Sequence, residues 1–335
     1  MDPTSGAPAS QAPSPAPLLR CEHLCLSYDG LRQAVADVSF TVHAGSIFAL
    51  LGPNGAGKTS TLRMLATLTD PTSGRIVVDG IDAASAPDGA AAVRSRIGYL
   101  PDNFALYENL TAIDYLEFFA RCYGVPAPER RRRAEALLVE LDLVGKRTAP
   151  INSLSRGMRQ RLGLAKTLIH QPKVLLLDEP ASALDPGARL KLRDVLLGLK
   201  RRGLAIVISS HILPDLAGLA DAVGIMEAGR MVHTGPVEEV ARATTRACLV
   251  YAVEVSANME RAERAIGEFG PRLKSHRVSP LAQGARFEVE LEGGTEAVAD
   301  LVESMVLRGA RVVHVAPLES ALESIYRASG ALQVS

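Results

Sequence analysis

Uniformly apolar runs alternate with segments whose apolar residues follow helical spacing, and this alternation predicts an α/β fold. The runs at 47–51, 174–177 and 205–209 are typical of parallel strands buried on both faces. Thr111 and Ser155 stand where helix N-caps are expected. Helices are predicted at 111–123, 129–143, 154–170 and 186–202, with further strands at 24–28, 38–42, 75–79 and 97–102.

The pattern changes after residue 245 and predicts a smaller domain at 246–335. Strands and helices are expected at 249–255, 259–269, 272–278, 285–291, 296–308 and 311–315, with a last helix from Leu318. This is the βαββαβ order of a ferredoxin-like α+β domain, for which we expect a role in dimerisation or regulation. Residues 1–17 are rich in Ala, Pro and Ser without the apolar core of a signal peptide, which predicts a disordered tail.

Composition narrows the class of protein. A length of 335 residues suggests two domains, and 37 Lys and Arg balance 37 Asp and Glu, which argues against a broad nucleic-acid-binding surface. No apolar run approaches the roughly 18 residues that cross a bilayer, so we expect a soluble chain. The four cysteines, Cys21, Cys25, Cys122 and Cys248, lack metal-ligand spacing and favour reduced structural thiols in a cytosolic compartment.

A basic run at 130–133 opens one of the predicted helices and allows two interpretations. It can form a solvated helix face, which is the more common case. It can also lie near anionic lipid headgroups or an acidic loop of a partner. The sequence favours the solvated face.

A glycine-rich loop follows the strand at 47–51 and precedes a helix-like segment at 61–65. The glycines let backbone N–H groups wrap around a phosphate, and the following helix adds its positive end. Lys58 is expected to reach the β- and γ-phosphates, and Thr59 to offer its hydroxyl to Mg²⁺. The loop matches the G-x-x-x-x-G-K-[ST] pattern and consists of Gly52, Pro53, Asn54, Gly55, Ala56, Gly57, Lys58, Thr59 and Ser60.

Two carboxylates, Asp178 and Glu179, follow directly after the strand at 174–177. Acidic side chains at the end of a buried strand are costly unless a cation or a reacting proton needs them. We therefore expect Asp178 to hold Mg²⁺, directly or through water, and Glu179 to orient and deprotonate the attacking water. His211 follows shortly after the strand at 205–209, at the edge where α/β sheets bind ligands, so a contact to the γ-phosphate is expected.

The order of these motifs resembles an ATP-binding cassette, the nucleotide-binding subunit of an ABC transporter, over roughly residues 18–240. The phosphate loop is similar to Walker A, 174–179 to Walker B, and His211 to the switch histidine. Asp185 ends a segment similar to the D-loop. Tyr28 alone suggests a half-buried strand residue, but the resemblance implies an A-loop aromatic that stacks on adenine. The family signature matches Leu154, Ser155, Arg156, Gly157 and Met158.

The resemblance implies a P-loop cassette at 18–245 with a helical subdomain at about 103–170, and ATP and Mg²⁺ as cofactors. It also implies that two cassettes pair head to tail, as a homodimer or a heterodimer, with the signature of one subunit acting on the ATP of the other. Because no membrane span is expected here, the partner is a separate transmembrane permease. The chain would then lie on the cytoplasmic face of the membrane, and no nucleic acid is expected.

Several residues depart from the family pattern. Arg156 replaces a signature glycine, Met158 a glutamine and Ala183 the D-loop glycine. Asp102 stands where the family places the Q-loop glutamine, which senses Mg²⁺ and couples the site to the permease. Its shorter, charged side chain would add negative charge near the γ-phosphate. The signature variant and the segment 318–326 resemble the ABC-2, daunorubicin-resistance branch of exporters.

These observations lead to the hypothesis of an ATP-hydrolysing subunit that drives export of a drug, lipid or other hydrophobic or polymeric substrate. Two alternatives stay open. One is a soluble, non-transport ABC ATPase acting on nucleic acid or ribosomes, whose hydrolysis nucleic acid would stimulate. The other is an ATP-binding interaction protein with weak turnover, which Asp102 suggests and which restoring glutamine at this position would test.

Overall fold

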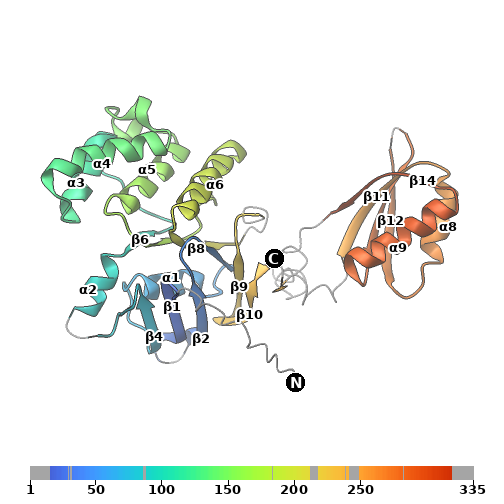
Figure 1. The fold of residues 1–335 in the computed structure, drawn as a ribbon, viewed down its shortest axis with the longest axis horizontal. Helices are drawn as coiled ribbons and strands as arrows, with labels where there is room; N and C mark the ends of the chain where they lie inside the picture. The colour runs from blue at the N-terminus through green and yellow to red at the C-terminus, as the bar shows by residue number, and fades with distance from the viewer. Residues whose placement is uncertain are drawn as a thin grey trace, which may run out of the picture.

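The computed structural model describes residues 16–28, 30, 32–85, 88–182, 184–211, 218–237, 239–240, 249–281 and 283–318. The predicted tail lies almost wholly outside these residues, and so do Ala183, Cys248 and all but the first residue of the helix predicted from Leu318. The larger unit combines two sheets with a group of helices, and a third sheet forms the smaller unit (Figure 1). No helix among the described residues is long and apolar enough to cross a membrane.

A six-stranded sheet with the order β10-β9-β3-β8-β7-β6 runs through the larger unit. The five strands from β9 to β6 pair in parallel, and β10 is antiparallel to β9. Three of them, β3, β7 and β8, are buried along their whole length, as their apolar sequences predict. The strands are β3 (Ile47–Leu51), β6 (Ile97–Leu100), β7 (Val174–Leu177), β8 (Ala205–Ser210), β9 (Ala222–Glu227) and β10 (Arg230–Pro236).

Two helices cover opposite faces of this sheet. Leu62 and Leu65 of α1 (Lys58–Leu65) belong to one apolar cluster, whereas Leu192 and Leu196 of α6 (Pro186–Arg201) belong to the other. Because β3, β7 and β8 are parallel, their carboxyl ends meet at one edge of the sheet. This edge brings together the loops that follow the three strands.

A four-stranded antiparallel sheet with the order β2-β1-β4-β5 packs on the α1 side. It consists of β1 (Leu19–Ser27), β2 (Gln33–Val42), β4 (Ser73–Val78) and β5 (Ile81–Asp82), and α2 (Gly89–Arg94) follows it. The sequence did not predict α2, β5, β9 or β10. The segment that forms α2 is short and rich in Ala, and the side chain of Asp88 makes no capping hydrogen bond.

Three helices, α3 (Ala112–Cys122), α4 (Ala127–Glu140) and α5 (Arg156–Leu168), group at one end of the larger unit (Figure 1). Thr111 and Ser155 cap α3 and α5 as predicted, accepting hydrogen bonds from the N–H groups of Asp114 and Met158. Helix α4 begins earlier than predicted because Pro128 is well tolerated in a first helical turn. Two 3₁₀ turns, Val144–Lys146 and Ile151–Ser153, connect α4 to α5.

The smaller unit has the strand order β12-β13-β11-β14, with every neighbouring pair antiparallel. The order of its elements along the chain is the predicted βαββαβ. Alternate residues of β13, including Phe287 and Val289, are buried against its helices. The elements are β11 (Leu249–Ala257), α8 (Met259–Gly267), β12 (Leu273–Pro280), β13 (Ala285–Leu291), α9 (Gly294–Leu307) and β14 (Arg311–Pro317).

Candidate functional site

The phosphate loop leaves the carboxyl end of β3 and enters α1 at Lys58. Two of its glycines are needed for space. A Cβ on Gly52 would lie 2.3 Å from the carbonyl oxygen of Met226, and one on Gly57 would lie 2.5 Å from that of Ala34. Gly57 also has a φ of 99°, a backbone conformation that residues with a side chain rarely adopt. The loop borders a cavity of about 240 Å³, whose walls are Ala34, Asn54, Gly55, Ala56, Gly57, Lys58, Thr59, Ser60, Asp102 and Glu179.

Asp178 follows β7 and is almost completely buried, with 1% of its surface exposed. Burial raises the pKa of its carboxyl group, while hydrogen bonds from the hydroxyls of Ser209 and Thr59 favour the ionised form and lower it. The Ser209 hydroxyl donates to Asp178 Oδ1 over 2.6 Å. The structure therefore places an acidic oxygen and the Thr59 hydroxyl side by side beneath the phosphate loop.

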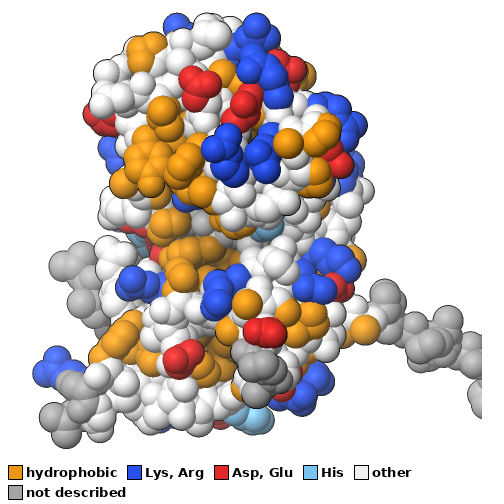
Figure 2. Space-filling view, turned by 90° about the vertical axis from the view of Figure 1, so that its left-hand side faces the viewer, with side chains coloured by type: hydrophobic (Ala, Val, Ile, Leu, Met, Phe, Trp, Pro, Cys, Tyr) orange, Lys and Arg blue, Asp and Glu red, His pale blue; other side chains and the backbone are white. Residues whose placement is uncertain are grey.

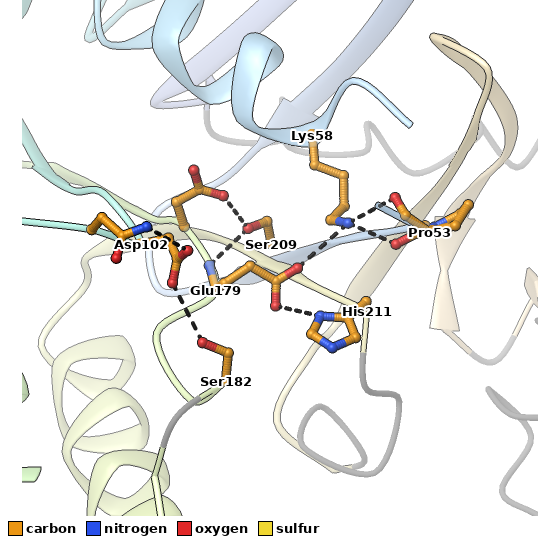
Figure 3. A network of polar contacts seen from close by, with 10 residues as sticks. Pro53, Lys58, Asp102, Glu179, Ser182, Ser209 and His211 are labelled. Atoms are coloured by element: carbon orange, nitrogen blue, oxygen red, sulfur yellow. Dashed lines mark hydrogen bonds and ion pairs between the residues drawn. The ribbon is translucent and has the colours of Figure 1, made fainter. Parts of the chain in front are cut away.

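Glu179 stands at the centre of a polar network (Figure 3). Its backbone has a φ of 47°, an unusual conformation for a residue with a side chain. Oε2 lies 2.8 Å from His211 Nδ1, and Oε1 lies 3.4 Å from Lys58 Nζ. The backbone N–H of Glu179 donates to Ser209 Oγ over 2.9 Å. Glu179 is thus held from three sides with its carboxylate at the phosphate-loop cavity.

Lys58 is buried, and its ammonium group is turned back on its own loop. Nζ donates to the carbonyl oxygens of Gly52 and Pro53 over 2.7 and 3.1 Å. These two oxygens accept hydrogen bonds from the ammonium, and Glu179 Oε1, 3.4 Å away, adds an ion pair without a hydrogen bond. A phosphate entering the loop would have to draw Lys58 away from at least one of them.

Tyr28 comes directly after β1 and is 62% exposed. Its hydroxyl lies 3.1 Å from Ser60 Oγ, so the ring stands beside the start of α1. An exposed aromatic ring anchored next to a phosphate loop has the position and the chemistry to stack on a nucleotide base.

The signature residues lie on a different element. Ser155 is the N-cap of α5, Arg156 is its first residue, and none of the signature residues borders the phosphate-loop cavity. Asp185 caps α6 by accepting a hydrogen bond from the N–H of Ala188 over 3.0 Å. The chain therefore brings the loop, the carboxylates and His211 together, and leaves the signature outside that group.

Asp102 lies two residues after β6 and borders the phosphate-loop cavity opposite the loop. Its carboxylate accepts a hydrogen bond from the Ser182 hydroxyl over 3.4 Å and another from Asn103 Nδ2 over 3.3 Å. The residue at the expected Q-loop position therefore reaches the segment that leads to Asp185 (Figure 3).

In the basic run at 130–133, Arg131 and Arg132 are exposed to solvent, whereas Arg130 and Arg133 are half-buried. Arg130 donates to the carbonyl oxygen of Val125, Arg131 pairs with Glu117 and Glu135, and Arg132 and Arg133 pair with Glu129. Figure 2 shows basic and acidic side chains interspersed over the helical end of the molecule. The run thus has acidic partners within its own chain, which supports the simpler of the two interpretations.

Sequence reasoning missed two supports of the site. Ser209 is the first, because its hydroxyl is hydrogen-bonded to both Asp178 and Glu179. The sequence signal for it was a polar residue near the end of the otherwise apolar strand β8. The turn between β9 and β10 is the second support. The N–H of Gly229 donates to the carbonyl oxygen of Ala56 and so braces the phosphate loop.

A phosphate-binding loop after β3, with two carboxylates after β7, a parallel strand of the same sheet separated from β3 by β8, defines a phosphate-loop nucleoside triphosphatase. The family model described as ABC transporter matches residues 35–182. "Uncharacterized ABC transporter ATP-binding protein YxlF" of Bacillus subtilis is 42% identical over 226 residues, which cover 67% of this chain and 72% of the relative. The chain therefore belongs to the ABC transporter ATP-binding proteins and is an ATPase of that family.

Other relatives carry more specific names. "Daunorubicin resistance ATP-binding protein DrrA3" of Streptomyces coeruleorubidus is 38% identical over 63% of this chain and 66% of its own length. "Methionine import ATP-binding protein MetN 2" of Burkholderia mallei is 37% identical over 64% of this chain and 55% of its own length. "Dimeric Structure of MJ0796, a Bacterial ABC Transporter Cassette" has a TM-score of 0.59 and 25% identity, covering 65% of this chain and 98% of that one.

Proposed function

We propose that this ATPase subunit hydrolyses Mg²⁺-bound ATP at an interface with a second cassette and drives a separate membrane permease, in an exporter. The observation that supports this most is the position of Glu179, held by His211 and Ser209 at the edge of the phosphate-loop cavity. The first residues of the signature helix α5 lie outside that cavity. In the proposed arrangement, the signature that completes this site therefore comes from a second cassette.

ATP binding is assigned to the loop and to Tyr28. The N–H groups between Gly52 and Ser60 and the positive end of α1 would surround the phosphates. Lys58 would exchange its carbonyl partners for phosphate oxygens, and the exposed ring of Tyr28 would stack on adenine.

The residues present fit Mg²⁺. No cluster of three or more His, Cys, Asp or Glu in the described part of the chain could hold a metal ion by itself. Mg²⁺ in nucleotide sites, however, needs only one or two protein oxygens beside the phosphates, and the Thr59 hydroxyl and the Asp178 carboxylate are hydrogen-bonded neighbours. When bound, the ion would neutralise charge on the β- and γ-phosphates.

Glu179 is the proposed general base. Once Lys58 turns to the phosphates, Oε1 of Glu179 loses its cation and can accept the proton of a water that attacks the γ-phosphorus. His211 keeps the other carboxylate oxygen in place. Asp178 stays fixed by Ser209, so the two neighbouring carboxylates can serve different tasks.

The second cassette would supply the missing part of the site. Ser155, capping α5, and the free N–H groups of its first turn form an anion site suited to the γ-phosphate bound by the partner cassette. The dimeric MJ0796 cassette, which shares this fold, supports pairing of this kind. The partner is a second copy of this chain or a related cassette.

Export is supported by the daunorubicin-resistance relative and by the signature variant. Because another relative is named for methionine import, the direction of transport needs a test of its own. The permease would place the chain on the cytoplasmic face of the membrane. Co-purification from membranes should recover one integral membrane protein with this chain, and inside-out vesicles carrying both should take up substrate only with ATP. Release from loaded inside-out vesicles instead would indicate import.

The pairing has its own test. Glu179→Gln with ATP and Mg²⁺ should double the mass of the chain in solution, or pair it with its partner cassette, whereas ADP should not. Ser155→Arg in the same background should prevent pairing, and an unchanged monomer under all conditions would contradict the composite site.

A further inference from the structure

Asp102 and Arg156 line the same cavity of about 360 Å³, next to Glu179 and Ser182. Asp102 carries a negative charge and Arg156 a positive charge. The cavity lies between the segment after β6 and the start of α5. Two opposite charges therefore line one cavity in the fold.

Asp102 has no cationic partner among the described residues. Its two hydrogen bonds, from Ser182 and Asn103, are 3.4 and 3.3 Å long, well above the usual length for such bonds. It shares the phosphate-loop cavity with Glu179, another carboxylate. A second negative charge near Glu179 and an incoming triphosphate is unfavourable unless a cation balances it.

The other cations near Asp102 are already engaged. Lys58 is held by the carbonyl oxygens of its loop and by Glu179. Arg159, on the same cavity wall, donates to the carbonyl oxygens of Leu154 and Asn152 and lies 3.6 Å from Glu108.

Arg156, by contrast, makes no hydrogen bond or ion pair within the described ranges and is exposed. It is the first residue of α5, where a positive charge opposes the helix dipole. The local helix thus gives no reason for an arginine at this position.

We propose that Arg156 is the counter-charge of Asp102, acting across this cavity as a positioning residue for the ATPase site. The cation holds Asp102 at the wall beside Ser182 and offsets its repulsion of Glu179 and of the bound phosphates. It also links the start of the signature helix to the segment after β6, since both border this cavity. This inference rests on the proposed function, because the site it adjusts is that of Glu179.

A double-mutant cycle on ATP hydrolysis tests the pair. Arg156→Gln should lower kcat/KM about tenfold when residue 102 is Asp, and less than about twofold in Asp102→Gln, because the charge to be balanced is then absent. Arg156→Lys should retain most of the activity, and the effect of Arg156→Gln should shrink at high salt. Equal losses in both backgrounds would overturn the proposal and would point to action of Arg156 on the nucleotide of the second cassette alone.

Arg159→Gln is the matched control. It removes a guanidinium from the same helix and the same cavity, but one that is already bound elsewhere. Its effect should be the same in both backgrounds. If Arg159→Gln showed a background-dependent loss equal to that of Arg156→Gln, the coupling would reflect the removal of any positive charge from this cavity. That result would contradict a specific pair of Arg156 and Asp102.

A chain that does not hydrolyse ATP would disprove the proposed function without deciding the pair. In that case the melting temperatures of the parent chain and of the three variants in the cycle, Arg156→Gln, Asp102→Gln and the double variant, decide. Coupling between residues 102 and 156 should appear as a departure from additivity of about 1–2 °C in the nucleotide-free chain. Additive shifts would overturn the proposal.

Discussion

The two units of the chain use charged residues in opposite ways. Among the described residues, every polar or charged side chain that is buried belongs to the larger unit, including Lys58 and Asp178 beneath the phosphate loop. In the smaller unit the described ion pairs stay in contact with solvent, as between Arg286 and Glu254 or between Arg272 and Asp300. Burying a charge costs free energy, so the larger unit holds groups that the fold alone does not require. The comparison separates residues kept for chemistry from residues kept for solubility and shape.

The largest stability effect is expected in the smaller unit. Phe287 is 1% exposed at the centre of its core, so Phe287→Ala should destabilise that unit by about 3–5 kcal/mol. ATP affinity of the larger unit should stay the same, because no site residue lies in the smaller unit. Calorimetry and nucleotide titration of the same sample measure both. A loss of ATP binding would break the separation of roles.

A smaller effect on stability, stabilising where Phe287→Ala is destabilising, is expected when Asp178 is replaced. Burial raises the pKa of this carboxyl group, so the folded chain holds the proton more tightly than the unfolded chain does. Ionisation therefore costs stability as the pH rises from the pKa of an unfolded aspartate, about 3.9, through the raised folded value. Asp178→Asn should stabilise the nucleotide-free chain by about 0.5–2 kcal/mol at neutral pH, with a smaller gain at acidic pH.

The same variant should lose Mg²⁺-dependent hydrolysis, since an amide cannot replace the carboxylate. Melting curves from pH 5 to pH 8 measure the stability part. A variant that is less stable than the parent at every pH would show that the hydrogen bonds from Ser209 and Thr59 outweigh the cost of burial.

The smallest effect is expected for an exposed pair. Arg286→Gln removes the contact to Glu254, in which both side chains are partly exposed, so the unfolding free energy should change by about 1 kcal/mol or less. Hydrolysis should be unaffected. A change as large as that of Phe287→Ala would mean that charge in this sheet does more than keep it soluble.

The sequence could predict those parts of the site that are contiguous in the chain. The phosphate loop, the pair Asp178 and Glu179, and the caps of α3 and α5 depend on neighbouring residues, and periodicity reveals their elements. The bond from Ser209 to Asp178 and the support of Ala56 by Gly229 depend on strands far apart in sequence. Only the strand order makes them neighbours. For the same reason the shared cavity of Asp102 and Arg156 could not be foreseen.

Single-turnover ATP hydrolysis by Glu179→Gln, beside Glu288→Gln as control, tests the central claim most directly. Both variants replace one glutamate with its amide, Glu179 at the phosphate-loop cavity and Glu288 on β13 of the smaller unit. We expect Glu179→Gln to cleave bound ATP about 10²–10⁴-fold more slowly with its ATP affinity retained, and Glu288→Gln to match the parent chain. Equal rates in the two variants would contradict the assignment of the chemistry to Glu179.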